Sequence, residues 1–212
     1  MTRILFIGNS YTSRHHLPRL IADLAAAADA SIEIEPVAIV AGGASLRRHW
    51  NAGLAQKTLA KSAWDFVVLQ EQSTLPVKNR TRYHENVRLF AAEVAKHGAT
   101  LALYLTWERQ GANTQSQIDA AVGDIAAEVA ARVVPVGPAW QRAMREHPDV
   151  PLYLDDGSHP TEAGVYLAAC VFVPALFGLQ ATGVAVSDRL GLDRTLAVDF
   201  HRIANETVVA LR

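Results

Sequence analysis

The chain has 212 residues, half of them hydrophobic, and its 20 Lys and Arg residues nearly balance 21 Asp and Glu residues. A chain of this size can bury one large core, so we expect a single domain over residues 1–212. The balanced charge leaves no broad basic surface for a phosphate backbone, which argues against nucleic-acid binding and favours a small-molecule ligand. Cys170 is the only cysteine. An intrachain disulfide and a thiolate metal cluster are therefore excluded, and we expect a buried, inert thiol.

The hydrophobic segments do not indicate a signal peptide or a membrane span. The N-terminal apolar run Ile4–Ile7 is too short for a secretory signal. The longest hydrophobic segment, Ala163–Leu179, is interrupted by two glycines and a proline, whereas a span needs about 20 predominantly apolar residues. We therefore expect a cytoplasmic protein that does not enter a membrane.

Short apolar runs alternate with longer amphipathic segments along the chain, a pattern typical of a parallel sheet with crossover helices. We expect strands over Ile4–Gly8, Ile32–Val40, Phe66–Leu69, Thr100–Thr106 and Val133–Val136. We expect helices over Leu17–Ala28, Leu46–Ala60, Tyr83–Lys96, Gln115–Ala131, Pro138 to about His147, from about Thr161, and over Leu192–Leu211. The order predicts a three-layer α/β/α sandwich with a five-stranded parallel sheet, doubly wound and flavodoxin-like.

Ligands bind such sheets beyond the carboxyl ends of the strands. The polar, Pro- and Gly-containing stretch over residues 146–160 predicts a long surface loop, and Thr161 is expected to cap the helix that follows, with Glu162 at the positive end of its dipole. This loop and the turns after the strands are therefore the segments in which we look for a site.

The turn after the first strand reads Gly8-Asn9-Ser10-Tyr11-Thr12. It would present the Ser10 hydroxyl at the top of the sheet, with the Ser10 backbone N–H pointing into the same space. Serine and asparagine are also common as helix caps and turn residues, so this turn alone does not define a nucleophile.

A base and a carboxylate occur together far downstream, in Asp156-Gly157-Ser158-His159-Pro160. A nucleophilic serine needs a general base within hydrogen-bond reach, and the base needs a carboxylate to fix its tautomer. Asp156 and His159 can supply both from one loop, although a solvated loop with an Asx-turn at Asp156 would show the same residues.

Together, Gly8-Asn9-Ser10 after the first strand and Asp156-x-x-His159 before the C-terminal helix resemble the first and last signature blocks of the SGNH (GDSL-like) hydrolase superfamily. Asn9 stands where Asp is commoner, and the run Gly8 to Thr12 is similar to a bacterial branch of the superfamily. The resemblance covers nearly the whole chain. It implies a serine esterase with Ser10, His159 and Asp156 as its catalytic triad.

The superfamily's second block supplies a glycine N–H to the oxyanion hole, and Ala41-Gly42-Gly43-Ala44-Ser45 follows the second strand here. Gly43 is the better match, with Gly42 as the alternative. The same turn could cap the next helix through Ser45 and still serve catalysis.

The third block departs from the family pattern G-x-N-D, because this chain has Gln70-Glu71-Gln72-Ser73. Alignment places Gln72 at the asparagine position, where a glutamine keeps an amide donor on a longer arm. Gln70 is the competing candidate. Glu71 would be an unexpected buried charge if it pointed inward.

The resemblance implies acyl transfer to water through an acyl-enzyme on Ser10, without a metal or organic cofactor, with a small acyl group such as acetyl on a carbohydrate. The oxyanion would accept from the N–H groups of Ser10 and Gly43 and from the Gln72 amide. His15 and His16 have no acidic neighbour in sequence, so we expect rim or substrate contacts at best. Asp155 is one residue out of phase with the motif.

The residues that would contact the substrate are harder to predict. Tyr11, Trp107, Glu108 and Arg109 follow the first and fourth strands and are candidates for lining the pocket. Packing at the sheet edge is an equal alternative for the two aromatics. The polar stretch over residues 73–82 is expected to form a flap.

Two other classes compete with an esterase. A degenerate, ligand-binding SGNH domain would follow if the glutamine replacement marked a lost oxyanion hole. A nucleotide-binding α/β protein would need a glycine-rich phosphate turn, but the turn after the first strand contains neither G-x-G-x-x-G nor a P-loop lysine.

Overall fold

A computed structural model describes residues 1–211. The strands are β1 (Thr2–Gly8), β2 (Ile34–Val40), β3 (Phe66–Leu69), β4 (Thr100–Leu105) and β5 (Arg132–Pro135). The helices are α1 (Ser10–Ser13), α2 (Leu17–Ala28), α3 (Leu46–Ala52), α4 (Leu54–Lys61), α5 (Leu75–Lys78), α6 (Arg80–Lys96), α7 (Gln115–Glu128), α8 (Val136–Glu146), α9 (Glu162–Phe177), α10 (Val184–Ser187) and α11 (Arg194–Ala210), with 3₁₀ turns η1 (Arg14–His16) and η2 (Asp188–Leu190).

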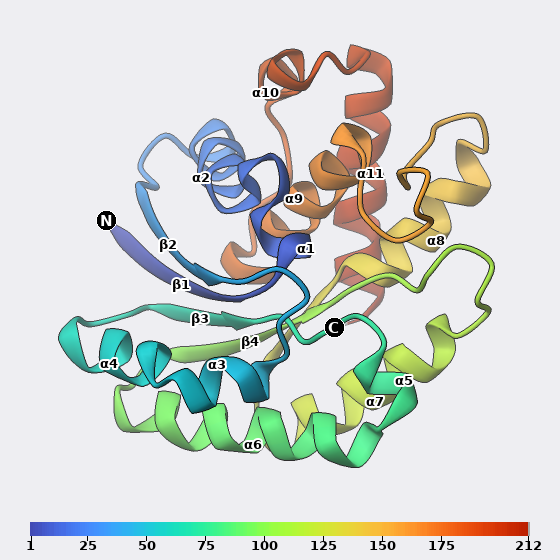
Figure 1. Ribbon diagram of the computed structural model, residues 1–212. Helices are drawn as coiled ribbons and strands as arrows, with labels where there is room; N and C mark the ends of the chain where they lie inside the picture. The colour runs from blue at the N-terminus through green and yellow to red at the C-terminus, as the bar shows by residue number, and fades with distance from the viewer. Residues whose placement is uncertain (212) are drawn as a thin grey trace.

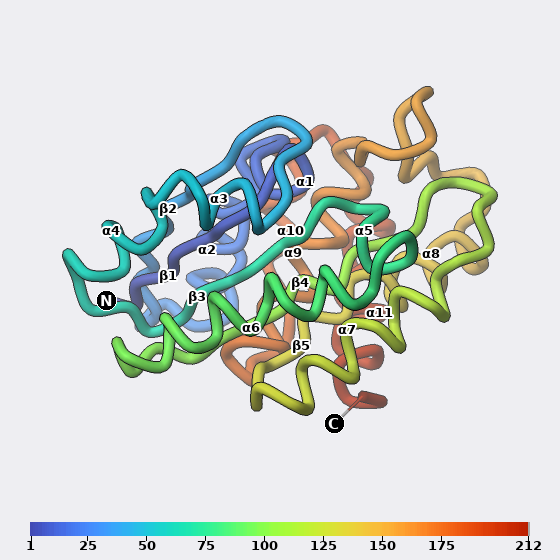
Figure 2. The backbone as a smooth tube through the Cα atoms, turned by 60° about the horizontal axis from the view of Figure 1, so that its bottom comes forward, coloured from blue at the N-terminus to red at the C-terminus, as the bar shows by residue number. Residues whose placement is uncertain are grey.

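The five strands form one parallel sheet in the order β2-β1-β3-β4-β5. Alternate side chains of β1 enter two different cores: Ile4 and Phe6 pack with α2, α8, α9 and α11, and Leu5 and Ile7 pack with α3, α4, α6 and α7. The sheet therefore lies between two helical layers (Figure 1), and Figure 2 brings the layer containing α6 toward the viewer. The predicted three-layer α/β/α fold is confirmed.

The strand order reverses between β1 and β3, because the chain moves from β1 outward to β2 and then crosses back to β3 on the other side. At such a switch point the loops after the two neighbouring strands diverge and leave a crevice at the carboxyl end of the sheet. Ser10 follows β1 and the Gln70-to-Ser73 segment follows β3. The topology therefore brings both segments to this crevice.

Helix α9 runs through the middle of one layer and is buried on nearly every side. This burial explains the long hydrophobic segment at its position in the sequence. Its N-cap is Thr161, whose hydroxyl accepts from the Gly164 N–H, and Cys170 is buried within it, both as predicted. None of the helices within residues 1–211 combines the length and apolar content that a bilayer span requires.

Two predicted segments differ from the structure. The single helix expected over residues 46–60 is broken into α3 and α4 at Gly53, whose φ of 70° is left-handed and ends a helix at little cost only for glycine. The expected flap over residues 73–82 is instead largely helical, because α5 and the first turn of α6 fall within it. Asn79 caps α6 by accepting from the Arg82 N–H, which the polar composition alone did not reveal.

Candidate active site

The turn after β1 holds Ser10 at the first position of α1. Asn9 caps this short helix by accepting from the Tyr11 N–H at 3.1 Å, and the Ser10 N–H has no hydrogen-bond partner among residues 1–211. A Cβ on Gly8 would lie 2.5 Å from Thr12 Oγ1. Position 8 therefore needs glycine for a close approach of the chain. The Ser10 N–H belongs to the first turn of α1, where backbone N–H groups have no partner within the helix, so it is an available donor.

Ser10, His159 and Asp156 form a continuous hydrogen-bonded chain. Ser10 Oγ lies 2.8 Å from His159 Nε2, and His159 Nδ1 lies 2.5 Å from Asp156 Oδ2. The hydrogen bond from the His159 ring, followed by that from the His159 backbone N–H, lowers the pKa of Asp156 to about 2. An ionised Asp156 accepts a hydrogen bond from the Nδ1–H group, so the Nε2 lone pair faces the serine hydroxyl.

The loop that carries Asp156 and His159 is closed by its own backbone. Asp156 Oδ1 accepts from the N–H groups of Ser158 and His159, each at 2.9 Å, as in an Asx-turn. The Leu154 N–H donates to the His159 carbonyl at 2.8 Å. The Asx-turn and the contact with the His159 ring thus coexist in one residue, because one carboxylate oxygen accepts from the loop backbone and the other from the ring.

The turn after β2 places Gly43 against the same cavity as Ser10 and His159. Gly43 has a φ of 61°, and its N–H has no hydrogen-bond partner within residues 1–211. Ser45 caps α3 by accepting from the Arg48 N–H. Gly42 does not contact this cavity of about 120 Å³, so of the two glycines the structure brings Gly43 to the serine.

The two glutamines after β3 have different surroundings. Gln70 is buried, its Oε1 accepts from the Asn9 N–H and the Thr12 hydroxyl, and its Nε2 donates to the Glu71 carbonyl. Gln72 lines the cavity at Ser10, and its Nε2 has no partner among residues 1–211. Gln70 therefore holds the Ser10 turn, and Gln72 is the glutamine with an amide free to face a ligand.

Glu71 does point inward, and its carboxylate joins the two turns on either side of it. Oε1 accepts from the N–H groups of Leu46 at 2.9 Å and Gln72 at 2.7 Å, and Oε2 accepts from Asn86 Nδ2 at 2.9 Å. Burial raises the pKa of Glu71, and these hydrogen bonds offset the rise in part. Because Leu46 follows the Gly43 turn, one buried carboxylate connects both loops that face the cavity.

Sequence reasoning missed the residues behind the site. His49 is buried and its Nε2–H donates to the Gly8 carbonyl at 2.7 Å, while burial lowers its pKa. Asn86, on α6, holds Glu71 and accepts from Arg47 Nε at 2.9 Å. The only signal was weak: His49 falls three residues after Leu46, on the face of α3 that packs inward.

Three aromatic side chains, Tyr11, Trp107 and Trp140, form a stack next to the site. Tyr11 stacks on Trp107 with ring centroids 4.7 Å apart, and Trp107 stacks on Trp140 at 3.9 Å. The Trp107 Nε1–H donates to the Ser158 carbonyl, and the Tyr11 hydroxyl lies 2.7 Å from Ser158 Oγ. Tyr11 reaches the cavity, but Trp107 is completely buried. Its predicted substrate contact is therefore corrected to a packing role.

The remaining candidates divide between rim and interior. Arg109 lines the cavity and is exposed, whereas Glu108 is turned inward and accepts from the N–H groups of Thr114 and Gln115. The prediction that Glu108 lines the pocket is wrong, because its carboxylate is needed to cap the start of α7.

The alternative base and acid lie apart from the serine contacts. His15 does have an acidic neighbour, since its Nδ1 lies 3.7 Å from Glu162 Oε1, a residue far away in sequence. His16 is exposed. Both histidines have left-handed φ values, 45° and 53°. Asp155 is exposed and makes no side-chain hydrogen bond within residues 1–211, whereas Asp156 makes three.

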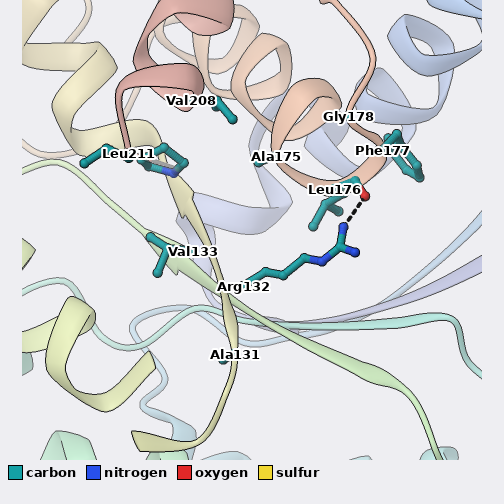
Figure 3. A pocket seen from close by; sticks show the side chains of 10 residues that line it. Ala131, Arg132, Val133, Ala175, Leu176, Phe177, Gly178, Val208 and Leu211 are labelled. Atoms are coloured by element: carbon teal, nitrogen blue, oxygen red, sulfur yellow. Dashed lines mark hydrogen bonds between the residues drawn. The ribbon is translucent and has the colours of Figure 1, made fainter. Parts of the chain in front are cut away.

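A larger cavity, about 620 Å³, lies elsewhere in the structure (Figure 3). It is bordered by the start of β5 and the ends of α9 and α11, and Arg132 donates to the Leu176 carbonyl at its edge. Its lining carries no serine, histidine, cysteine or carboxylate side chain. Size therefore does not mark the site here, and the chemistry gathers in the smaller cavity at Ser10.

A parallel α/β/α sandwich with a hydrogen-bonded Ser–His–Asp chain at its switch point has the organisation of the SGNH hydrolase class. No family model matches the sequence, and no curated protein sequence matches it. Several solved structures, however, match the structure of this chain. A candidate SGNH hydrolase from Slackia heliotrinireducens is 32% identical, with a TM-score of 0.70, over 82% of this chain and 98% of that one.

Two further structures share the fold at lower identity. A DUF4886 family protein from Bacteroides uniformis has a TM-score of 0.77 at 20% identity, covering 98% of this chain and 95% of its own. A variant of an acetyl-xylooligosaccharide esterase from Geobacillus stearothermophilus has a TM-score of 0.68 at 20% identity, covering 83% and 94%. On the identity and coverage of the Slackia protein, the chain belongs to the SGNH hydrolase superfamily.

Proposed function

We propose that the protein is a serine esterase that removes a small acyl group through an acyl-enzyme on Ser10. The observation that carries this proposal is the hydrogen-bonded chain from Ser10 Oγ through the His159 ring to Asp156. This is the arrangement in which a serine hydroxyl can lose its proton as it attacks a carbonyl carbon.

In the proposed reaction, Ser10 Oγ forms a bond to the acyl carbon while its proton passes to His159 Nε2. The carbonyl oxygen becomes an oxyanion that accepts from the N–H groups of Ser10 and Gly43 and from the Gln72 amide, donors left without partners in the described chain. The carbon–oxygen bond to the alcohol then breaks, and His159 returns the proton to the leaving alcohol. Water, activated by His159, releases the acid in the same manner.

The size of the catalytic cavity favours a small acyl group. At about 120 Å³ it is well below the roughly 300–1,000 Å³ of pockets that enclose a drug-sized ligand. Acetyl esters are the substrate class that we propose, and one of the structural neighbours is an acetyl-xylooligosaccharide esterase. We further propose that the Gly8-to-Thr12 block places the chain in a bacterial branch of the superfamily. We also propose that the protein is a single domain located in the cytoplasm, and cell fractionation would test this location.

The test is hydrolysis of 4-nitrophenyl acetate together with labelling by a fluorophosphonate, which reacts only with an activated serine. Ser10→Ala should abolish both, with an unchanged thermal unfolding midpoint. Ser13→Ala is the matched control, because Ser13 is exposed on the same short helix, and it should keep both. Hydrolysis in Ser10→Ala at the wild-type rate would refute the proposal. Absence of labelling in the wild-type protein would instead favour a ligand-binding domain without catalysis.

A further inference from the structure

A second cavity of about 340 Å³ adjoins the catalytic cavity. The two cavities share Gln72, Ser73 and Arg109 in their linings, so a ligand held at Ser10 can extend from one into the other. The second cavity lies between the segment after β3, which includes α5, and the loop after β4 that leads into α7. These elements lie next to each other at one end of the sheet (Figure 1).

Two cations border this second cavity without an anionic partner. Arg109 and Lys78 are both exposed, and neither side chain makes an ion pair or hydrogen bond within residues 1–211. By contrast Arg80, two residues beyond Lys78, is paired with Asp124. Unpaired cations on both sides of a concave surface raise the local concentration of anions and favour a negatively charged group there.

The lining of the second cavity contains no carboxylate. Three acids are sequence neighbours of lining residues, and each carboxylate is bound elsewhere. Glu71 accepts from Leu46, Gln72 and Asn86. Glu108 accepts from the backbone at the start of α7, and Asp119 accepts from Gln115 Nε2 at 2.7 Å. Val77 and Ile118 add an apolar surface. The cavity therefore suits a ligand in which a short apolar or sugar-like part carries an anionic group at its end.

Building on the esterase function proposed above, we propose that the preferred substrates are esters that carry a carboxylate or phosphate group, which Arg109 and Lys78 bind in the cavity next to Ser10. An anionic group on the alcohol part keeps the acetyl ester proposed above, whereas one on the acyl part replaces acetyl by a longer acyl group that reaches into the second cavity. Both placements share the same chemistry, and the experiment separates them.

The acyl part is tested with 4-nitrophenyl hemisuccinate against 4-nitrophenyl butyrate, and the alcohol part with 3-acetoxybenzoate against 3-acetoxybenzamide. The measured quantity is the ratio of kcat/KM for the charged ester to that for its neutral partner. Because each ratio is compared between variants, the intrinsic reactivity of the esters cancels. Arg109→Gln and Lys78→Gln should each lower the ratio in one of the two arms by about three- to tenfold, as expected for exposed charges.

Lys61→Gln is the control, because Lys61 is exposed at the end of α4 and borders neither cavity. It should leave both ratios unchanged. High salt should lower the wild-type ratio by screening. Ratios that stay the same in Arg109→Gln and Lys78→Gln, in both arms, would overturn the anionic site while leaving the esterase in place.

If the wild-type protein hydrolyses none of the four esters, the esterase proposal itself fails. The anionic site is then tested by calorimetric titration with succinate. Weaker binding by the double variant Arg109→Gln, Lys78→Gln than by the wild-type protein would support the site, and equal binding would overturn it.

Discussion

Replacement of Asp156 by Asn separates the two contacts of this side chain, one with the loop backbone and one with the His159 ring. Oδ1 accepts from two backbone N–H groups and Oδ2 accepts from His159 Nδ1. An asparagine keeps its oxygen toward the backbone, so its NH₂ group faces the ring. Nδ1 must then accept, and the Nε2 proton points at Ser10, which is the tautomer that cannot remove the serine proton.

The size of the effect follows from the exposure of the carboxylate. Charges 4 Å apart interact by about 4 kcal/mol at an effective dielectric of about 20 and by about 1 kcal/mol in water. The Asp156 side chain is 49% exposed, so we take about 2 kcal/mol, or roughly 30-fold in rate. In the Asn variant the ring must also give up its hydrogen bond to the amide before it adopts the tautomer that can act as a base. This cost of about one hydrogen bond lowers the rate by roughly a further tenfold. The expected loss in kcat/KM is therefore about 300-fold, less than the roughly 10⁴-fold for a buried triad aspartate.

The assay is hydrolysis of 4-nitrophenyl acetate, with the unfolding midpoint measured on the same samples. Asp155→Asn is the matched control, because this exposed neighbour makes no side-chain hydrogen bond within residues 1–211, and it should behave as wild type. A folded Asp156→Asn enzyme within threefold of the wild-type kcat/KM would refute the assignment of Asp156 as the residue that orients the base.

Three further changes test other parts of the structure. Gln72→Ala should lower kcat for 4-nitrophenyl acetate by about 100-fold with a smaller change in KM, as for one lost oxyanion donor, and an unchanged kcat would exclude this residue from the oxyanion hole. Gly164→Ala should lower the free energy of unfolding by about 1–3 kcal/mol in urea denaturation, because the new Cβ would lie 2.5 Å from Trp140; no loss of stability would contradict this close packing. Burial raises the pKa of Glu71, so ionisation of this side chain lowers the stability of the folded protein as pH rises from the unfolded pKa to the folded one. Urea denaturation from pH 4 to 8 should therefore show that the free energy of unfolding of the wild type, relative to Glu71→Gln, falls with pH. A constant difference would show that the buried charge carries no such cost.

The order of strands and helices was predictable because the central strands β1, β3 and β4 are buried on both faces and so form short apolar runs bounded by turn residues. The break between α3 and α4 was not, since it depends on the left-handed backbone of Gly53 inside an otherwise helical pattern. The flap was misassigned for a related reason. The cap at Asn79 is a single local hydrogen bond that overrides a polar composition.

For the site, the sequence could predict which side chains lie near one another but not how their hydrogen bonds are shared. Alignment favoured Gln72 and left Gln70 as the competing candidate, and the contacts of Gln70 with Asn9 and Thr12 separate the two. Trp107 was ambiguous because an aromatic after a strand packs or binds ligand equally well, and here its ring lies between two others.

Trp107, in the aromatic stack beside the site, and the exposed Arg109 have different structural roles. Trp107 contacts Tyr11, next to the proposed nucleophile, and also donates to the Ser158 carbonyl, next to the proposed base. One rigid side chain thus fixes the spacing between two segments that are far apart in the chain. Arg109, two residues further along, is solvent-exposed and makes no such connection. A substitution at Arg109 can therefore change ligand preference while the spacing between Ser10 and His159 stays the same.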